Sequence, residues 1–504
     1  MPRRVLASFV ALAFGCTAIA VVGLRANAVD DRSAATHIAW KACGGRFQCA
    51  TLSVPADYTE PQGEQVRLAL TRQRATDTDH RLGSLVINFG GPGDPGSSTL
   101  RDFVGEVPSE IRARYDLVSF DPRGIGNSKP IQCIDNRTVE MLLSEDPTPN
   151  GPADLRAFYD GTNDNIDLVQ ACIDRAGEWL SHIGSRDVAR DLDQLRSALG
   201  DAQLHYLGFS YGTVIGSVYA QMFPTHVGHL VLDGPVNLSW SPQQELAANA
   251  ASFEQAFDEF LANCAKRRRC PFHSNGDPRQ AFVELQRRFE AGLSLATTSP
   301  SGRRSSRRAG VAAFYVGVFS ALYDKRSGWP TLAQGLHEAA TNGDGTVLLL
   351  LADAYNGRHD DGSYDNSNET IGVILCDDHF DPVPTFDEFV AQYNQMVATY
   401  PLLGAFAGST LLGCDPRLPH PRVADQLGDV RVAGTRPVVI VGTTEDPATP
   451  YEGARDLAQR ITGSRLITFA STEHTAYAKS QCIDTAVDAY LLHGRLPARN
   501  LRCN

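Results

Sequence analysis

A series of short apolar runs, each ending in a loop rich in Gly, Pro or Asp, most constrains how this chain can fold. These runs lie at 85–89, 117–120, 204–209, 230–232, 438–441 and 466–469. They are continuous rather than alternating, which is typical of parallel strands that are buried on both faces. Helical patterns lie between them, at 188–199 and 211–222. The alternation predicts a mostly parallel sheet flanked by helices, with an antiparallel strand pair ahead of it over 51–75.

This alternation of strands and helices stops after Asp233 and returns at 438–441. Most of the segment between these two points has a helical pattern. Ligands bind at the carboxyl edge of open α/β sheets, so we expect the helical segment to lie over that edge as a lid. The predicted organisation is a core made of residues 29–240 and 414–504, with a helical lid at 241–413.

The first 28 residues have the pattern of an export signal. Arg3 and Arg4 precede an apolar stretch over 5–24, and Ala28 ends a small-residue site suited to cleavage. Two alternatives stay open. The stretch is long enough for an uncleaved membrane anchor, and Cys16 offers a site for lipidation. We expect cleavage and a secreted chain, extracellular or associated with the cell wall, without stable membrane association afterwards.

The chain has 11 cysteines, and removal of the signal would leave ten, an even number. An exported chain meets an oxidising environment, so these cysteines are expected to pair. Connectivity cannot be deduced from spacing alone. Local spacing suggests the pairs Cys43–Cys49, Cys133–Cys172, Cys264–Cys270, Cys376–Cys414 and Cys482–Cys503. No close Cys-x-x-Cys or Cys/His cluster occurs in the sequence, so we expect neither a metal site nor a cofactor.

The formal net charge of −12 argues against a nucleic-acid partner, because phosphate binding needs a clustered basic surface. Two basic clusters do occur, at 266–269 and 303–308. Neither contains aromatic residues, and we expect both to be solvated loops.

The pentapeptide Gly208-Phe209-Ser210-Tyr211-Gly212 lies between an apolar run and a helical pattern rich in small residues. A serine on a tight strand-to-helix turn has its hydroxyl exposed above the sheet, and the flanking glycines let the strand and the helix approach closely. An ordinary Gly-rich turn is the alternative. The strand before the motif and the helix after it favour Ser210 as a nucleophile.

A serine nucleophile needs hydrogen-bond donors where negative charge develops. One candidate donor is the main-chain amide of Tyr211, the residue after the serine. The second would come from the Gly-rich loop at 88–93, where either Gly90 or Gly91 could serve. A phosphate-binding loop is the alternative, but this loop lacks the Gly-Lys-Ser/Thr ending of such sites.

A serine also needs a base, and the base needs a carboxylate that orients it. His474 follows the apolar run 466–469 and is the predicted base. His493 is the other histidine in this part of the chain, and it is expected at a helix C-terminus on the surface. Asp446 and its neighbour Glu445 both follow the run 438–441, in the order Ser, acid, His that this arrangement requires.

Several segments, in this order, resemble the actinobacterial tripeptidyl aminopeptidase group, which comprises secreted relatives of proline iminopeptidase with the α/β-hydrolase fold. The matching segments are 88–93 (Asn-x-Gly-Gly-Pro-Gly), 121–128 (Asp-Pro-Arg-Gly-x-Gly-x-Ser), 208–213 (Gly-x-Ser-Tyr-Gly-Thr), 446–450 (Asp-Pro-x-Thr-Pro) and the closing pattern from Cys482 to Cys503. One difference is that Glu473 and Thr475 flank His474, where the group usually has a glycine.

The resemblance implies an α/β-hydrolase fold and hydrolysis of a peptide bond near a free N-terminus through an acyl-enzyme. It assigns the acid to Asp446, so that Ser210 would attack, His474 would carry the proton and Asp446 would orient His474. An N-terminal ammonium needs carboxylates in the cavity.

Three acidic residues of the lid are candidates for this recognition: Glu369, Asp377 and Asp378. Surface charge without a ligand explains each of them equally well.

Two other functions remain compatible with the sequence. An esterase or lipase could use the same three catalytic residues, since this fold hosts both chemistries. A catalytically inactive protein used for binding would be favoured by loss of one of these residues, and all three are present. Epoxide hydrolase or dehalogenase chemistry is disfavoured, because those enzymes have an aspartate where Ser210 stands.

Overall fold

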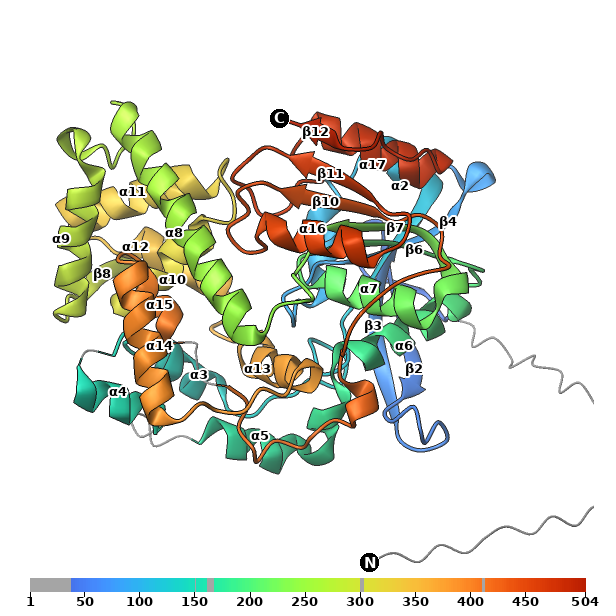
Figure 1. Ribbon diagram of the computed structural model, residues 1–504, viewed down its shortest axis with the longest axis horizontal. Coiled ribbons are helices and arrows are strands. Elements are labelled where there is room, and N and C mark those ends of the chain that lie inside the picture. The colour runs from blue at the N-terminus through green and yellow to red at the C-terminus, as the bar shows by residue number, and fades with distance from the viewer. Residues whose placement is uncertain (1–37, 150, 161–166, 300–302, 410–412) are drawn as a thin grey trace, which may run out of the picture. The chain divides into compact units, whose positions relative to one another are not determined.

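A ten-stranded sheet forms the core of the computed structural model, which describes residues 38–149, 151–160, 167–299, 303–409 and 413–504 (Figure 1). Within this sheet, strand pairs β1–β2, β2–β3 and β3–β5 are antiparallel, and all other pairs are parallel. In sheet order the strands are β1 (Lys41–Ala42), β2 (Phe47–Pro55), β3 (Gln65–Gln73), β5 (Tyr115–Phe120), β4 (Gly83–Asn88), β6 (Leu204–Phe209), β7 (Val227–Asp233), β10 (Val439–Thr443), β11 (Arg465–Phe469) and β12 (Leu501–Cys503). The six predicted strands and the antiparallel pair are confirmed, and β12 is an additional edge strand. The predicted export signal and Cys16 lie outside the described residues.

Helices cover both faces of the sheet because neighbouring residues of each buried strand point to opposite faces. On β4, Val86 packs into one core cluster, whereas Leu85 and Ile87 pack into another. The first face is covered by α6 (Ser185–Ala198), α7 (Gly212–Met222) and α16 (Tyr451–Arg460). The second is covered by α1 (Gly96–Phe103), α2 (Ser109–Arg114) and α17 (Gln481–His493).

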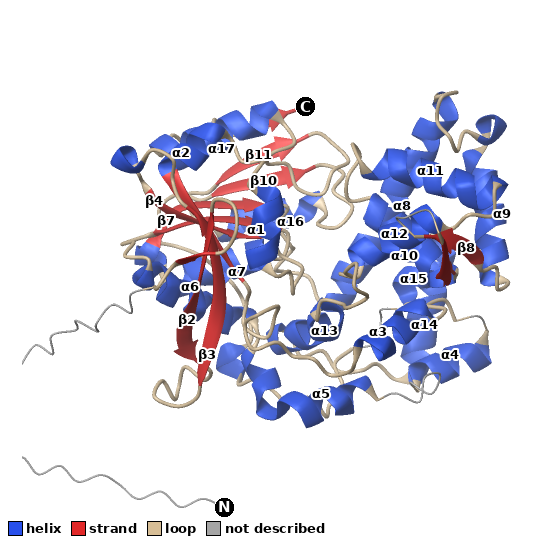
Figure 2. Cartoon of the chain, turned by 180° about the vertical axis from the view of Figure 1, so that it is seen from behind, coloured by secondary structure: helices blue, strands red, loops and turns tan. Residues whose placement is uncertain are grey.

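A large helical insertion follows β7, as the sequence predicted (Figure 2). It has its own core of aromatic side chains, among them Phe257, Phe282 and Phe314, all with no exposed surface. Its elements are α8 (Pro242–Lys266), α9 (Pro278–Glu290), β8 (Leu295–Thr298), β9 (Arg304–Ala309), α10 (Val311–Ala321), α11 (Gly328–Thr341), α12 (Thr346–Tyr355), α13 (Ser367–Asp378), α14 (Phe386–Thr399) and α15 (Gly404–Gly408).

A second helical excursion, between β5 and α6, packs against this insertion. It contains α3 (Asn136–Ser144), α4 (Pro152–Tyr159) and α5 (Leu168–Ala176), which Figures 1 and 2 both show beside α13 and α14. The Tyr159 hydroxyl donates to the Pro384 carbonyl at 2.6 Å. Apolar side chains of α4 and α14 share a small core cluster. From the sequence, this excursion was expected to belong to the core, and its packing against the lid was not predicted.

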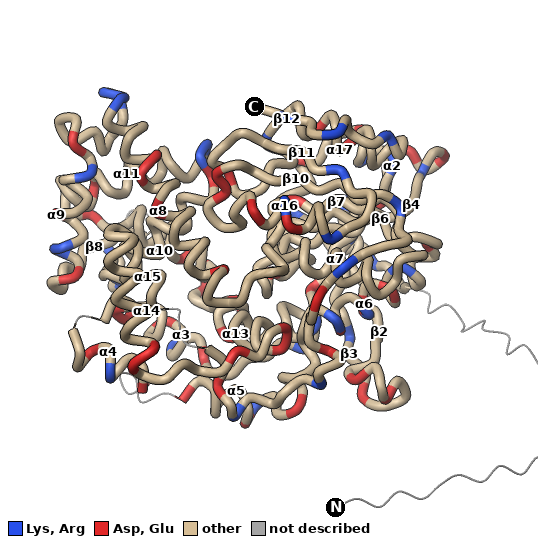
Figure 3. The backbone as a smooth tube through the Cα atoms, in the orientation of Figure 1, with Lys and Arg blue, Asp and Glu red and all other residues tan. Residues whose placement is uncertain are grey.

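The second basic cluster is not a solvated loop, contrary to the prediction. Residues 304–309 form β9, whose Arg307 makes ion pairs with Glu140 of α3 and Asp353 of α12. Arg358 also pairs with Glu140, at 3.2 Å. These acidic partners explain the result, because they neutralise the cation where the two helical segments meet. Elsewhere, residues of both signs are spread over the core and the helices (Figure 3).

Five disulfides form, and their pairing is the one suggested by local spacing. They are Cys43–Cys49, Cys133–Cys172, Cys264–Cys270, Cys376–Cys414 and Cys482–Cys503. Disulfides persist in oxidising compartments, so they support a location outside the cytosol. Among the described helices, none is long and apolar enough to cross a membrane.

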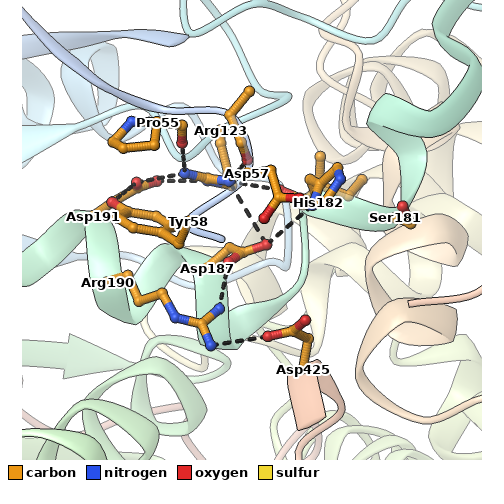
Figure 4. A network of polar contacts seen from close by, with 12 residues as sticks. Pro55, Asp57, Tyr58, Arg123, Ser181, His182, Asp187, Arg190, Asp191 and Asp425 are labelled. Carbon is orange, nitrogen blue, oxygen red and sulfur yellow. Dashed lines mark hydrogen bonds and ion pairs between the residues drawn. The ribbon is translucent and has the colours of Figure 1, made fainter. Parts of the chain in front are cut away.

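Arg123 of the Asp-Pro-Arg-Gly segment ties the core together at the end of β2 (Figure 4). Its side chain has no exposed surface, and two of its nitrogens donate to the Asp191 carboxylate, each at 2.7 Å. The remaining donors reach the carbonyls of Pro55, Ala56 and His182, each at 2.9 Å. This saturated hydrogen bonding lets a charged group remain buried between strand and helix.

Candidate active site

Ser210 lies at the turn between β6 and α7. Its φ is +52°, a left-handed conformation that residues with a side chain seldom adopt, and its N–H donates to the Asp233 carbonyl at 2.9 Å. A β-carbon on Gly212 would come within 2.7 Å of Asn88 Oδ1, so the first turn of α7 can approach β4 only with glycine there. The turn places Ser210 at the carboxyl edge of the sheet, where it lines a cavity.

Two main-chain amides beside Ser210 are available to a substrate. Within the described residues, neither Gly91 N nor Tyr211 N donates to any acceptor, and both residues line the cavity with Ser210. The N–H of Gly90 donates instead to Asn88 Oδ1 at 3.0 Å. The structure therefore favours Gly91 over Gly90 as the second donor. Gly90 has a packing role, because a β-carbon there would come within 2.9 Å of Tyr211 N.

His474 and Asp446 meet at the ends of β11 and β10. His474 Nδ1 lies 2.8 Å from Asp446 Oδ1, and the Asp446 side chain is fully buried. The same carboxylate accepts main-chain N–H groups of Ala448 at 3.0 Å, Thr449 at 2.8 Å and Thr475 at 3.1 Å. These bonds fix the carboxylate and, through it, the imidazole. His474 Nε2 is therefore the ring nitrogen that can exchange a proton with a reacting group.

Glu445, the alternative to Asp446 as the acid, and His493, the alternative to His474 as the base, do not join this group. Glu445 is exposed and accepts a hydrogen bond from the Thr472 hydroxyl at 2.9 Å. His493 is the exposed last residue of α17. Ser210 Oγ has no hydrogen bond to His474 in the described chain. Such bonds often form only when substrate is bound.

Asp233, at the end of β7, connects the serine turn to the loop between β11 and α17 that carries His474, called here the histidine loop. This connection was not predicted from the sequence. Its carbonyl accepts the Ser210 N–H, and its buried carboxylate accepts N–H groups of Ala476 at 3.0 Å and Tyr477 at 2.7 Å. Burial raises the pKa of Asp233 to about 6, although these two bonds oppose the shift. The feature of the sequence that could have indicated this role is the position of Asp233 at the end of β7, the strand that pairs with β6, which precedes Ser210.

The lid contacts the histidine loop directly. The main-chain N–H of His474 donates to the Tyr323 carbonyl at 3.1 Å, and the Tyr323 ring lies edge-on to the imidazole with centroids 5.2 Å apart. Glu473, one of the two residues that flank His474 where the group usually has a glycine, is buried and accepts the Lys325 N–H at 3.2 Å. Burial raises the pKa of Glu473. The unusual residue beside the base therefore anchors the loop to the lid.

A cavity of about 650 Å³ extends from Ser210 beneath the lid. Its walls come from the serine turn, from α5 and from lid helices α8 and α13, and they are largely apolar. Apolar side chains facing it include Leu168, Val169, Leu246, Ile371, Leu375 and Leu418. Ile371 and Leu375 are 39% and 47% exposed, so an apolar ligand could cover them.

The three predicted recognition carboxylates are all engaged with main-chain groups. Glu369 lines the cavity but accepts the N–H groups of Cys133 and Ile134. Asp378 lines the cavity and accepts the Ser185 N–H at 2.8 Å. Asp377 lies outside the cavity wall and accepts the Ile183 N–H at 3.1 Å. Burial raises the pKa of all three.

Glu245 on α8 differs from these three carboxylates and was not among the residues predicted from the sequence. It lines the cavity together with Ser210 and Tyr211. Among the residues that the structure describes, no donor or cation contacts its carboxylate. Burial raises the pKa of Glu245 to about 7. Its position on a long amphipathic helix gave no sequence signal that would separate it from surface glutamates.

The fold and the site together define the class of protein: a serine hydrolase built on a mostly parallel α/β sheet with a helical lid. Residues 83–480 match the family described as alpha/beta hydrolase fold. The serine protease Hip1 of Mycobacterium tuberculosis is 36% identical over 520 residues, which cover 99% of this chain and 96% of that protein.

Two further relatives carry different names. A protein of Mycobacterium tuberculosis named carboxylesterase B is 36% identical over 467 residues, covering 90% of this chain and 86% of that protein. The tripeptidyl aminopeptidase of Streptomyces lividans is 32% identical over 502 residues, covering 94% and 87%. The chain belongs to the α/β-hydrolase family and, within it, to the actinobacterial group that includes these serine hydrolases.

Proposed function

We propose that this protein is an exported serine exopeptidase that hydrolyses a peptide bond near a free N-terminus. The observation that carries the proposal is Glu245, an unpaired carboxylate in an apolar cavity that also contains Ser210. An isolated carboxylate in such a place costs free energy unless a cation accompanies it. The N-terminal ammonium of a peptide would supply that cation, while the apolar walls would take the first side chains of the peptide.

In this mechanism Ser210 Oγ attacks the carbonyl carbon of the scissile bond and transfers its proton to His474 Nε2. Asp446, bonded to Nδ1, orients the imidazole and stabilises its charged form. The amides of Tyr211 and Gly91 donate to the oxyanion of the tetrahedral intermediate. His474 then protonates the leaving amine, and the N-terminal fragment stays on Ser210 as an ester. Water, activated by the same imidazole, releases this fragment and restores the serine.

The names of the relatives support a peptidase, since both a serine protease and a tripeptidyl aminopeptidase are among them. The relative named carboxylesterase B keeps ester hydrolysis as a second candidate. The catalytic residues would be the same, and the difference would lie in what the cavity recognises. Export is supported by the five disulfides.

A matched set of substrates tests the proposal: a tripeptide p-nitroanilide with a free N-terminus, its N-acetylated form, and an ester with the same acyl group. Glu245→Gln should raise KM for the free peptide by about 10-fold or more, because a charge-assisted contact is lost. KM for the acetylated peptide should stay within about 2-fold. Mass spectrometry of the products would give the number of residues removed.

This experiment needs two control variants. Ser210→Ala sets the inactive baseline, and Glu284→Gln makes the same chemical change on α9, on an exposed residue outside the cavity. Ester turnover without any amide turnover would contradict the peptidase proposal. An unchanged KM in Glu245→Gln would contradict the role given to Glu245.

A further inference from the structure

Tyr211 is held at both ends, by the serine turn through its main chain and by the lid through its side chain. Its hydroxyl donates to Asp378 Oδ2, on the last residue of lid helix α13. The Ser185 hydroxyl lies 3.0 Å from the Tyr211 hydroxyl and donates to the same carboxylate oxygen at 2.8 Å. The Tyr211 and Asp378 side chains are buried at this contact. A lid carboxylate is therefore hydrogen-bonded to the side chain of the residue after the nucleophile.

Capping of a helix does not account for this arrangement. One oxygen of Asp378 accepts the N–H of Ser185, the first residue of α6, which satisfies a free amide of that helix. The second oxygen turns to the two hydroxyls. No arginine or lysine contacts Asp378 in the described residues, and burial raises its pKa. A buried carboxylate without a cation is costly, and here its second oxygen is stabilised by hydrogen bonds from the hydroxyls of Tyr211 and Ser185.

The end of α13 is itself firmly attached to the core. The Cys376–Cys414 disulfide lies two residues before Asp378, and the Asp378 carbonyl accepts the Leu427 N–H at 3.1 Å. Asp377 contributes a separate contact through the Ile183 N–H. Asp378 is thus a fixed point against which the Tyr211 side chain can be aligned.

We propose that Asp378 is a positioning residue for the oxyanion site: through the Tyr211 hydroxyl, it fixes the orientation of the Tyr211 main-chain amide. The inference rests on the proposed function, in which that amide stabilises the tetrahedral intermediate. The amide follows Ser210, whose backbone is in a left-handed conformation that persists only where surrounding contacts hold it, and the contact of Tyr211 with Asp378 adds to the Ser210–Asp233 hydrogen bond at this turn. A donor acts in the transition state only when it is aimed in advance at the developing charge.

Two variants test this inference. Tyr211→Phe keeps the amide and removes only the hydroxyl, and Asp378→Asn removes the charged acceptor. Each should lower kcat for a peptide p-nitroanilide by about 10-fold, with KM within about 2-fold, because the lost interaction acts in the transition state. The double variant should lose little more than either single variant, since both break the same contact.

A tetrahedral analogue gives a readout that a purely structural role would not change. A peptide boronate that bonds to Ser210 should lose affinity by the same factor as kcat/KM, whereas a product peptide should bind as before. The matched control is Asp377→Asn, which weakens the attachment of α13 without touching Tyr211. It should lower the melting temperature but leave the ratio of boronate to product affinity unchanged.

Two results would overturn the inference. One is a wild-type affinity ratio in Tyr211→Phe, which does not depend on Asp378→Asn folding. The other is an Asp377→Asn variant that reproduces the loss in kcat, since general docking of the lid would then explain the effect. Failure of the proposed function is distinguishable, because the wild-type protein would in that case not hydrolyse the peptide p-nitroanilide at all.

Discussion

At the residue scale, the protonation of Glu245 couples substrate recognition to pH. Burial raises the pKa of this carboxyl to about 7, close to the pKa of about 7.7–8.0 that is usual for a peptide α-amino group. A contact between carboxylate and ammonium needs both groups charged. Lowering the pH below about 7 protonates Glu245, and raising it above about 8 deprotonates the peptide.

KM for a peptide with a free N-terminus should therefore be lowest between these two values and rise on either side. In Glu245→Gln the rise on the acidic side should disappear, because the amide does not titrate. Steady-state kinetics between about pH 5.5 and 9 would measure this, with the N-acetylated peptide as the reference for pH effects that do not involve the N-terminus of the substrate. An acidic limb that persists in Glu245→Gln would assign it to another group.

The residues of the site differ in how far the sequence revealed them. Ser210 and His474 were identifiable because each follows a buried strand and their order along the chain is restricted. The same argument left Glu445 and Asp446 open, and the resemblance to the aminopeptidase group favoured Asp446. The sequence did not show that the Glu245 carboxylate is free of hydrogen bonds or that the Asp378 carboxylate is hydrogen-bonded. That distinction depends on how α8 and α13 are rotated above the sheet, and periodicity does not specify the orientation of a lid helix towards a core.

At the scale of elements, the lid contacts both halves of the catalytic machinery. The end of α13 holds Tyr211, and the segment after α10 holds the histidine loop through Tyr323 and Lys325. The strands themselves were predicted well, because continuous apolar runs mark them. The excursion between β5 and α6 was not, because its short amphipathic helices show only their own periodicity and not the surface that they cover.

Glu473 provides a test of the contact between lid and base. Glu473→Gln keeps an acceptor for the Lys325 N–H, whereas Glu473→Ala removes it and leaves that partly buried amide unpaired. We expect near wild-type kcat for the first variant and a decrease of several-fold, about 3- to 10-fold, for the second, because His474 is less firmly placed. Equal kcat for both variants, with only the melting temperature lowered, would show that the contact is purely structural.

At the scale of the whole molecule, stability depends on the buried charges around Arg123. This guanidinium joins the end of β2 to α6 through Asp191, and Asp187 lies 3.7 Å away. Arg190 extends the network from Asp187 to Asp425 of the segment between lid and core, at 2.9 Å (Figure 4). The sequence motif marked Arg123 without indicating this role, because its partners lie far apart along the chain.

Arg123→Met should lower the free energy of unfolding by about 3–5 kcal/mol, because Asp191 would remain buried without its cation. Chemical denaturation of the disulfide-intact protein would measure the change. The matched control is Arg417→Gln, which breaks an exposed pair with Asp167 and should cost about 0–1 kcal/mol.

A buried carboxylate deprived of its cation has a raised pKa, so it destabilises the folded state as the pH rises through that value. The decrease in the free energy of unfolding caused by Arg123→Met should consequently become smaller as the pH is lowered. If Arg123→Met lowered this free energy no more than Arg417→Gln at every pH, the buried network would contribute no more than a surface ion pair.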